Sequence, residues 1–174
     1  MPGLKPAPDM PAPPDREFRA DEILRVLASN RVNFVVIGGL AVQGHGYVRA
    51  TYDLDVIVEP TTLNLTRLSE ALAELEAELR APATLALGDP HQLRKAPLIP
   101  VLTRFGPLDV VHVQHVAGSP ASYGALRDAA LVVDLDGIEV PLAGLSDLIR
   151  MKRAAGRDQD LADIEALTRD AEST

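Results

Sequence analysis

The sequence contains no cysteine, which excludes disulfide bonds and thiolate-bound metals among its 174 residues. It also lacks an apolar run close to the roughly 20 residues that span a membrane, so no membrane partner is expected. The first residues are rich in proline and do not form a basic segment followed by an apolar one, so we expect no secretory signal peptide. A cytoplasmic location is the expectation that follows from these absences.

An excess of positive charge is absent as well. Lysine and arginine number 17 against 25 aspartate and glutamate residues, which gives a formal net charge of −8 at pH 7. A generally basic surface, the usual means of binding nucleic acid, is therefore excluded. A local basic patch stays open, and its candidate members are Arg94, Lys95, Arg150, Lys152, Arg153 and Arg157.

The composition that is present is that of an ordinary globular protein, with 47% hydrophobic and 24% charged residues. Residues 1–14 include six prolines and few large apolar side chains, which predicts a disordered arm. The remaining length suits one domain with a substantial core. We therefore expect residues 15–174 to form a single domain that ends in two helices.

Secondary structure is predicted from the spacing of apolar residues, which is helical in some segments and strand-like in short β-branched runs. Residues 83–97 fit neither pattern. The alternation of helices and strands predicts an α+β fold, in which helices flank a mixed β-sheet. The predicted helices span residues 18–27, 40–47, 63–79, 119–130, 145–155 and 158–171. The predicted strands span residues 33–37, 52–58, 99–104, 108–113, 131–135 and 138–141.

Two consecutive glycines, Gly38 and Gly39, separate a short apolar strand from a predicted helix. Glycine allows the backbone to approach a phosphate group, and the N-terminus of a helix offers free N–H donors. The same residues are also the usual way to build a tight turn. The pair therefore fits both a phosphate-binding turn and a purely structural one.

The strand that follows carries two carboxylates, Asp53 and Asp55, in an otherwise apolar segment. Residues i and i+2 of a strand point to the same face, so the two side chains project together. Like charges held this close repel unless a cation lies between them, and Mg²⁺ suits such oxygen pairs. A solvated face of the sheet is the alternative interpretation.

A third acid, Asp109, lies in another apolar strand. If that strand is a neighbour in the sheet, Asp109 completes a cluster of three carboxylates. Two Mg²⁺ ions bound by such a cluster would hold the phosphates of a nucleotide and activate an attacking hydroxyl. Solvated acids are also common at strand ends, so Asp109 by itself is compatible with a structural role.

Together these features resemble the nucleotidyltransferase superfamily with the DNA polymerase β-like fold. The local pattern, in one-letter code GG…HG…RxTxDLD, is more similar to the AbiE-type and MenT-type nucleotidyltransferase toxins of bacterial toxin–antitoxin systems. Residues 147–160 also resemble that group, in which a lysine on a late helix contacts the nucleotide. The resemblance covers roughly residues 34–167. Many superfamily members have Gly-Ser where this chain has Gly38-Gly39, so a serine hydroxyl is missing here.

The resemblance implies roles for the acidic residues and an activity. Asp53 and Asp55 would be metal ligands, and Asp109 would be the third carboxylate and could act as general base on the acceptor hydroxyl. The implied reaction transfers a nucleoside monophosphate from an NTP to an acceptor hydroxyl and releases pyrophosphate. The implied acceptor is RNA, at the 3′ end of tRNA, and a toxin would have a cognate antitoxin protein. Transfer to a protein or an aminoglycoside, and a non-catalytic nucleotide-binding module, are the alternatives.

Several charged or polar residues are further candidates for nucleotide binding. By the resemblance, Lys152 would neutralise triphosphate charge as a mobile cation, although a solvated helix cation is the plainer interpretation. Arg49 and Thr51 precede the acidic strand and could reach phosphate oxygens, while Arg49 could equally pair with one of the acids of that strand. Arg157 and Asp160 are candidates too, or they pair with each other at i and i+3.

The histidines indicate little chemistry. His45, between two glycines, could contact a nucleotide, but a structural role at the end of the short helix is favoured. His112 is out of phase with Asp109 in its strand, so the two are expected to face opposite sides of the sheet. Without cysteines or closely spaced histidines, no zinc site is expected.

Overall fold

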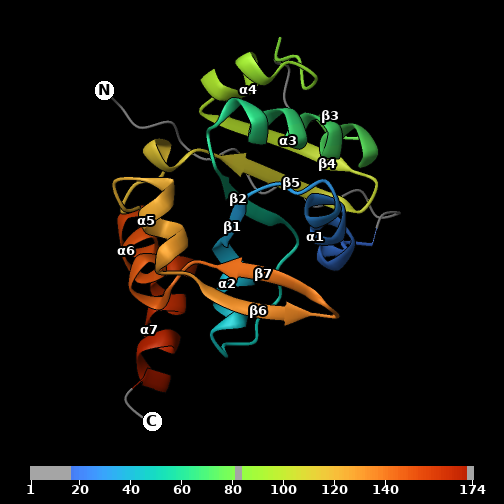
Figure 1. Cartoon of the computed structure of the whole chain (residues 1–174). Coiled ribbons are helices and arrows are strands. Elements are labelled where there is room, and N and C mark those ends of the chain that lie inside the picture. The colour runs from blue at the N-terminus through green and yellow to red at the C-terminus, as the bar shows by residue number, and fades with distance from the viewer. Residues whose placement is uncertain (1–16, 81–83, 172–174) are drawn as a thin grey trace.

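The computed structural model describes residues 17–80 and 84–171. The described residues form a mixed sheet of seven strands in the order β3-β4-β5-β2-β1-β7-β6, with helices packed around it (Figure 1). This architecture confirms the predicted α+β class. The predicted arm of residues 1–14 lies outside the described residues, and the single domain over 15–174 stays a prediction.

Three buried strands form the centre of the sheet: β1 (Phe34–Ile37), β2 (Leu54–Val58) and β5 (Gly106–Val111). β1 is antiparallel to β2, while β5 is parallel to β2. Most of their apolar side chains are fully or almost fully buried, and each of these stabilises the fold by about 1.5–3 kcal/mol relative to exposure. This buried centre carries Asp55 and Asp109, and Asp53 directly precedes β2.

Shorter or more exposed strands extend the sheet on both sides. β4 (Leu98–Thr103) pairs with β5, and the two-residue β3 (Glu78–Leu79) pairs with β4. On the other side β7 (Ile138–Leu142) lies parallel to β1 and forms a hairpin with β6 (Leu131–Leu135). All strands that the sequence predicts are present, with each end within two residues of the predicted one.

The predicted helix over 63–79 is wrong in its last turn, because α3 covers Thr62–Glu74. Leu75 caps the helix, Glu76 adopts a left-handed φ of 52°, and the Ala77 amide donates to the Leu72 carbonyl (2.9 Å). The chain then turns into β3. The spacing of the leucines would allow the helix to continue, but the backbone of β3 forms hydrogen bonds with β4 instead. The local sequence contains no feature that predicts the pairing of β3 with β4.

Two further helices differ from the prediction. α4 (Pro90–Lys95) lies in the segment that fitted no pattern, and its Asp89 cap accepts a hydrogen bond from the His91 amide (2.9 Å). α5 (Tyr123–Asp128) is shorter than the predicted 119–130, because Ser122 caps it by accepting from the Ala125 amide (3.1 Å). In both cases a cap residue sets the start of the helix.

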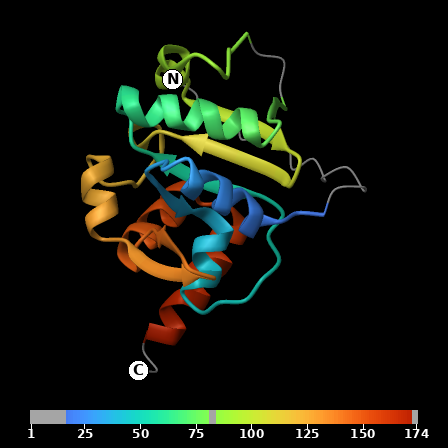
Figure 2. The ribbon, with the colours of Figure 1, turned by 45° about the vertical axis from the view of Figure 1, so that its right-hand side comes forward.

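The other helices lie within three residues of their predicted bounds at each end. α1 (Ala20–Ser29) packs on α3, and α2 (Gly38–Gly44) begins at the glycine pair. α6 (Leu145–Ala155) and α7 (Asp158–Ala171) have the predicted bounds, with Gly156 in a left-handed conformation between them. Figures 1 and 2 show α3 and α4 beside β4 at one end of the molecule, and α6 and α7 at the other end.

Among the described residues, no helix combines the length and the apolar character that crossing a membrane requires.

Candidate active site

The three acidic side chains that the sequence singles out converge at the centre of the sheet, where β2 and β5 lie side by side. β2 and β5 are parallel neighbours, and their register places Asp55 directly opposite Asp109. Asp53 precedes Asp55 by two residues and shares its face. One carboxylate oxygen from each residue lies within 4.8 Å of the others. The predicted three-carboxylate cluster is therefore present, because the parallel register adds the third acid to the pair.

The cluster is electrostatically unsatisfied by its protein surroundings. Burial, and to a smaller extent the neighbouring charge of Asp53, raises the pKa of Asp55 to about 7. The positive charges of Lys152, Arg157 and Arg80 act in the opposite direction without cancelling the effect. A divalent cation bound by the three oxygens would supply the missing charge, so the residues present fit a metal site.

Arg80 is a neighbour of the cluster that sequence reasoning missed. It directly follows β3, its amide donates to the Pro100 carbonyl (3.0 Å), and its guanidinium forms an ion pair with Asp109. Because β3 exists only through its pairing with β4, no local signal could have pointed to Arg80. A metal ion that uses Asp109 as a ligand has to compete with this guanidinium.

The glycine pair lies against the acidic cluster. Gly38 has a φ of 70°, and a Cβ atom at this position would overlap the Asp55 carboxylate. A Cβ atom on Gly39 would lie 2.8 Å from Thr51 Oγ1 and 3.0 Å from Arg49 Nη2. Position 38 therefore requires glycine, whereas a side chain at position 39 would have to displace the Thr51 hydroxyl and the Arg49 guanidinium. The turn brings the first amides of α2 close to the cluster.

The Thr51 hydroxyl lies beside the start of α2, next to the point from which a side chain at position 39 would emerge. It donates weakly to the Asp53 main-chain carbonyl (3.3 Å) and to Asp53 Oδ1 (3.4 Å). The predicted closeness of Thr51 to the site is thus present in the structure. A hydroxyl is available near the turn even though the residue after Gly38 is not serine.

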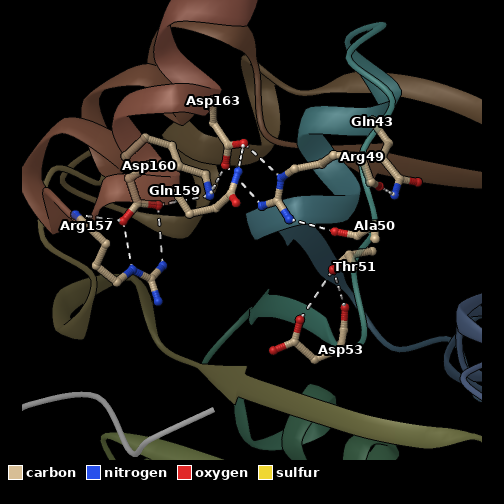
Figure 3. A network of polar contacts seen from close by, with 10 residues as sticks. Gln43, Arg49, Ala50, Thr51, Asp53, Arg157, Gln159, Asp160 and Asp163 are labelled. Carbon is tan, nitrogen blue, oxygen red and sulfur yellow. Dashed lines mark hydrogen bonds and ion pairs between the residues drawn. The ribbon is translucent and has the colours of Figure 1, made fainter. Parts of the chain in front are cut away.

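Arg49 forms an ion pair, but with a partner that the sequence did not suggest. Its Nε donates to Asp163 Oδ1 (2.8 Å) and its Nη2 to Asp163 Oδ2 (3.0 Å), while Nη1 donates to the Ala50 carbonyl (2.9 Å) (Figure 3). The expectation that a structural pair would involve Asp53 or Asp55 is wrong. The partner comes from α7, 114 residues later, so only tertiary packing could reveal it.

Lys152 is neither a mobile cation nor a solvated one. Only 5% of the residue is exposed, and its Nζ forms ion pairs with Asp160 (3.1 Å) and Asp163 (2.9 Å). α7 packs against α6 and covers the lysine, which a reading of α6 alone does not anticipate. Its charge still reaches the acidic cluster, since it lowers the pKa of Asp55.

The predicted pair of Arg157 and Asp160 is confirmed. Arg157 Nε donates to Asp160 Oδ2 (2.7 Å), and the Arg157 amide donates to the same oxygen (3.2 Å). Burial alone would raise the pKa of Asp160, but hydrogen bonds from Arg157 and Lys152 outweigh it and hold the pKa below the usual value. The Arg157 side chain is 60% exposed, so it lies at the rim of the buried network.

Two other groups of candidates do not join the site. His45 caps α2, with its Nε2 2.8 Å from the Ala143 carbonyl oxygen, which is the structural role that the sequence favours. The six basic residues that were candidates for a local basic patch do not gather on one surface. Arg94 bonds Thr62 on α3, Lys152 is buried, and α4 lies at the opposite end of the molecule from α6 in both ribbon views.

Residues 17–169 match the family described as nucleotidyltransferase of unknown function (DUF6036). No curated protein matches the sequence. A candidate nucleotidyltransferase from Thermotoga maritima superposes with a TM-score of 0.51 at 14% identity, over 90% of this chain and 98% of the other. An antigenic nucleotidyltransferase-like protein from Paracoccidioides brasiliensis superposes with a TM-score of 0.53 at 18% identity, over 84% and 72%. These likenesses concern the fold, and they confirm the predicted polymerase β-like nucleotidyltransferase fold.

Proposed function

Because the chain belongs to the DUF6036 family of nucleotidyltransferases, we propose that it transfers a nucleoside monophosphate from an NTP to an acceptor hydroxyl and releases pyrophosphate. The observation that carries this reaction is the convergence of Asp53, Asp55 and Asp109 beside a glycine turn at the start of a helix. Carboxylates at this spacing suit metal-assisted phosphoryl chemistry, and the turn suits a phosphate.

The three carboxylates are the proposed ligands of Mg²⁺, and a pair of ions is the proposed arrangement. Bound there, Mg²⁺ would neutralise phosphate charge and lower the pKa of the acceptor hydroxyl. Asp109 would accept the proton of that hydroxyl as general base. The Arg80 guanidinium pairs with this carboxylate and would hold it in place.

The triphosphate would lie on the turn side of the cluster. The first amides of α2, after Gly38 and Gly39, would donate to phosphate oxygens, and the Thr51 hydroxyl would replace the missing serine. Arg157 would contact the phosphates from the rim, with Asp160 holding its guanidinium in place. Lys152 would act from a fixed position, through its field at Asp55.

For the acceptor we propose the 3′ end of tRNA, and for the biological role a toxin with a cognate antitoxin. The support is the GG…HG…RxTxDLD pattern and the later lysine helix, which resemble AbiE-type and MenT-type toxins. The net charge of −8 favours a second candidate, a cationic acceptor such as an aminoglycoside. Transfer to a protein side chain is a third acceptor class.

Label transfer tests the activity and the acceptor together. The purified protein is incubated with Mg²⁺ and each α-labelled NTP in turn, with total tRNA, an aminoglycoside mixture or a protein extract as acceptor. We expect label on tRNA with the wild type, and at least a 100-fold loss with Asp55→Asn. Arg169→Ala, at the exposed far end of α7, is the matched control that should keep full activity.

Label on aminoglycoside or protein alone would overturn the tRNA proposal and leave the reaction type intact. Equal label with the wild type and Asp55→Asn would overturn the proposed reaction itself. The toxin role is tested by inducing the wild type and Asp55→Asn in growing bacteria. Only the wild type should arrest growth.

A further inference from the structure

Asp163 lies at the centre of a buried ionic network that ties the last helix to the candidate active site (Figure 3). Its side chain is fully buried, with 0% exposure. It accepts two hydrogen bonds from Arg49 and one from Gln159 Nε2 (3.0 Å), and it forms an ion pair with Lys152 (2.9 Å). In the sequence Asp163 is one of several acids on a helix, so nothing there singles it out.

A buried carboxylate is expensive unless charged partners surround it. One partner of Asp163 would be enough to compensate its charge, yet it holds two cations from separate segments. Burial tends to raise the pKa of Asp163, but the hydrogen bonds from Arg49 and Lys152 hold it below the usual value. The carboxylate is therefore a stable anion that both cations share.

The two cations that Asp163 holds flank the candidate nucleotide site. The Arg49 guanidinium lies against Gly39, and Gln43 of α2 donates to the Arg49 carbonyl (2.5 Å). Arg49 thus connects the glycine turn to the segment that carries Thr51. The second cation, Lys152, acts on the acidic cluster, because its positive charge lowers the pKa of Asp55. Arg49 pairs with Asp163, and Lys152 pairs with both Asp163 and Asp160 of the same helix.

We propose that Asp163 is a positioning residue for the donor nucleotide. It holds the Arg49 guanidinium behind the glycine turn and the Lys152 amine toward the acidic cluster, and this proposal rests on the proposed nucleotidyl transfer. Without Asp163, the freed Arg49 guanidinium would turn to the nearby Asp53, whose carboxylate the Thr51 hydroxyl already contacts. That movement would distort the turn and compete with the metal ion.

The test is the steady-state kinetics of Asp163→Asn, which keeps the shape of the side chain and removes its charge. We expect the KM for NTP and the Mg²⁺ concentration at half-maximal rate each to rise about tenfold or more, with a smaller change in kcat. Gln159→Ala is the matched control, because it removes a neutral contact to the same carboxylate and leaves both cations paired. Its KM and Mg²⁺ dependence should equal those of the wild type.

Folding is checked by circular dichroism and thermal unfolding of each variant. If Asp163→Asn does not fold, Asp163→Glu replaces it, since it retains the charge and displaces it by one methylene. It should also raise the KM for NTP. A folded Asp163 variant with wild-type KM and Mg²⁺ dependence overturns the proposal, provided that the wild type is active and Asp55→Asn is not. An inactive wild type overturns the proposed function instead, and this inference with it.

Discussion

Asp55 shows at the scale of one residue how the site combines stability with function. It lies on a buried central strand, where a lone carboxylate is unfavourable, and its pKa rises to about 7. Its register partner Asp109 and its neighbour Asp53 add negative charge on the same side. The strand tolerates this arrangement because its other side chains are fully buried hydrophobic residues that hold it in place.

A proton and a metal ion should therefore compete for Asp55. Because its pKa is raised to about 7, we expect the apparent affinity for Mg²⁺ to be constant above pH 7 and to weaken below it, by up to about tenfold per pH unit. Calorimetric titration with Mg²⁺ at pH 6, 7 and 8 measures this. The same affinity at all three pH values would contradict the assignment, and Asp55→Asn should show little dependence on pH.

The same residue affects the stability of the metal-free protein. The carboxyl is protonated in the folded state below about pH 7 and in the unfolded state only below about 4, so its contribution is present at low pH and is lost as the pH rises through 7. This sign is opposite to that of an ion-paired acid. Added Mg²⁺ should offset the loss by binding the ionised form.

Position 39 provides a second test at the residue scale. Gly39→Ser restores the Gly-Ser pair of many superfamily members, but its Cβ atom would lie 2.8 Å from Thr51 Oγ1. We expect the single variant to lose at least tenfold in activity, because the new side chain displaces the threonine. Gly39→Ser combined with Thr51→Ala should recover part of that loss. If the double variant is worse than the single one, the hydroxyls do not share one role.

At the scale of elements, the two-residue strand β3 decides the position of Arg80. Its pairing with β4 ends α3 early and brings the guanidinium to Asp109. A cation there competes with the metal, so Arg80→Gln should lower the Mg²⁺ concentration at half-maximal rate about threefold. Rate measurements against Mg²⁺ concentration provide the check. Arg104→Gln, in an exposed pair with Glu76, is the control that should change nothing.

The α6–α7 pair is held by a second set of charges. Asp160→Asn removes the anion between Lys152 and Arg157, and we expect it to lower the free energy of unfolding by about 3 kcal/mol at pH 7. The pKa of Asp160 is lowered in the folded state, so its contribution is present above pH 4 and disappears as the pH falls further.

Thermal and denaturant unfolding at pH 7, 5 and 3 measure the effect. The gap between the wild type and Asp160→Asn should be unchanged from pH 7 to pH 5 and should narrow at pH 3. Glu165→Gln, which breaks an exposed pair on the same helix, should cost under about 0.5 kcal/mol at every pH. A gap that widens in acid would contradict the role of Asp160.

At the scale of the whole molecule, charge constrains how an acceptor approaches. The net charge is −8, and the candidate basic residues are divided between opposite ends of the molecule or engaged in pairs. For a tRNA acceptor we therefore expect kcat/KM to stay level or to rise as salt is added from low ionic strength, because salt screens repulsion. A cationic acceptor should show the opposite trend. A steep fall with tRNA would reveal a basic contact surface.

Many helices, strands and site residues of this protein were predictable because they depend on the spacing of residues that are close in the sequence. The helical spacing in residues 145–171, broken at Gly156, predicts α6 and α7 to the residue. The period of two in the acidic strand places Asp53 and Asp55 on one face. The glycine pair predicts the turn at which α2 begins, and together these features indicate the nucleotidyltransferases to which the matched family belongs.

Only the tertiary structure decided which charges meet. The pairs Arg49–Asp163, Lys152–Asp163 and Arg80–Asp109 join residues that are 11 to 114 positions apart, and no local pattern encodes such distances. A carboxylate or a guanidinium looks alike in sequence whether water or an opposite charge surrounds it. Burial makes the difference, because a charge removed from water is stable only where packing supplies its partner.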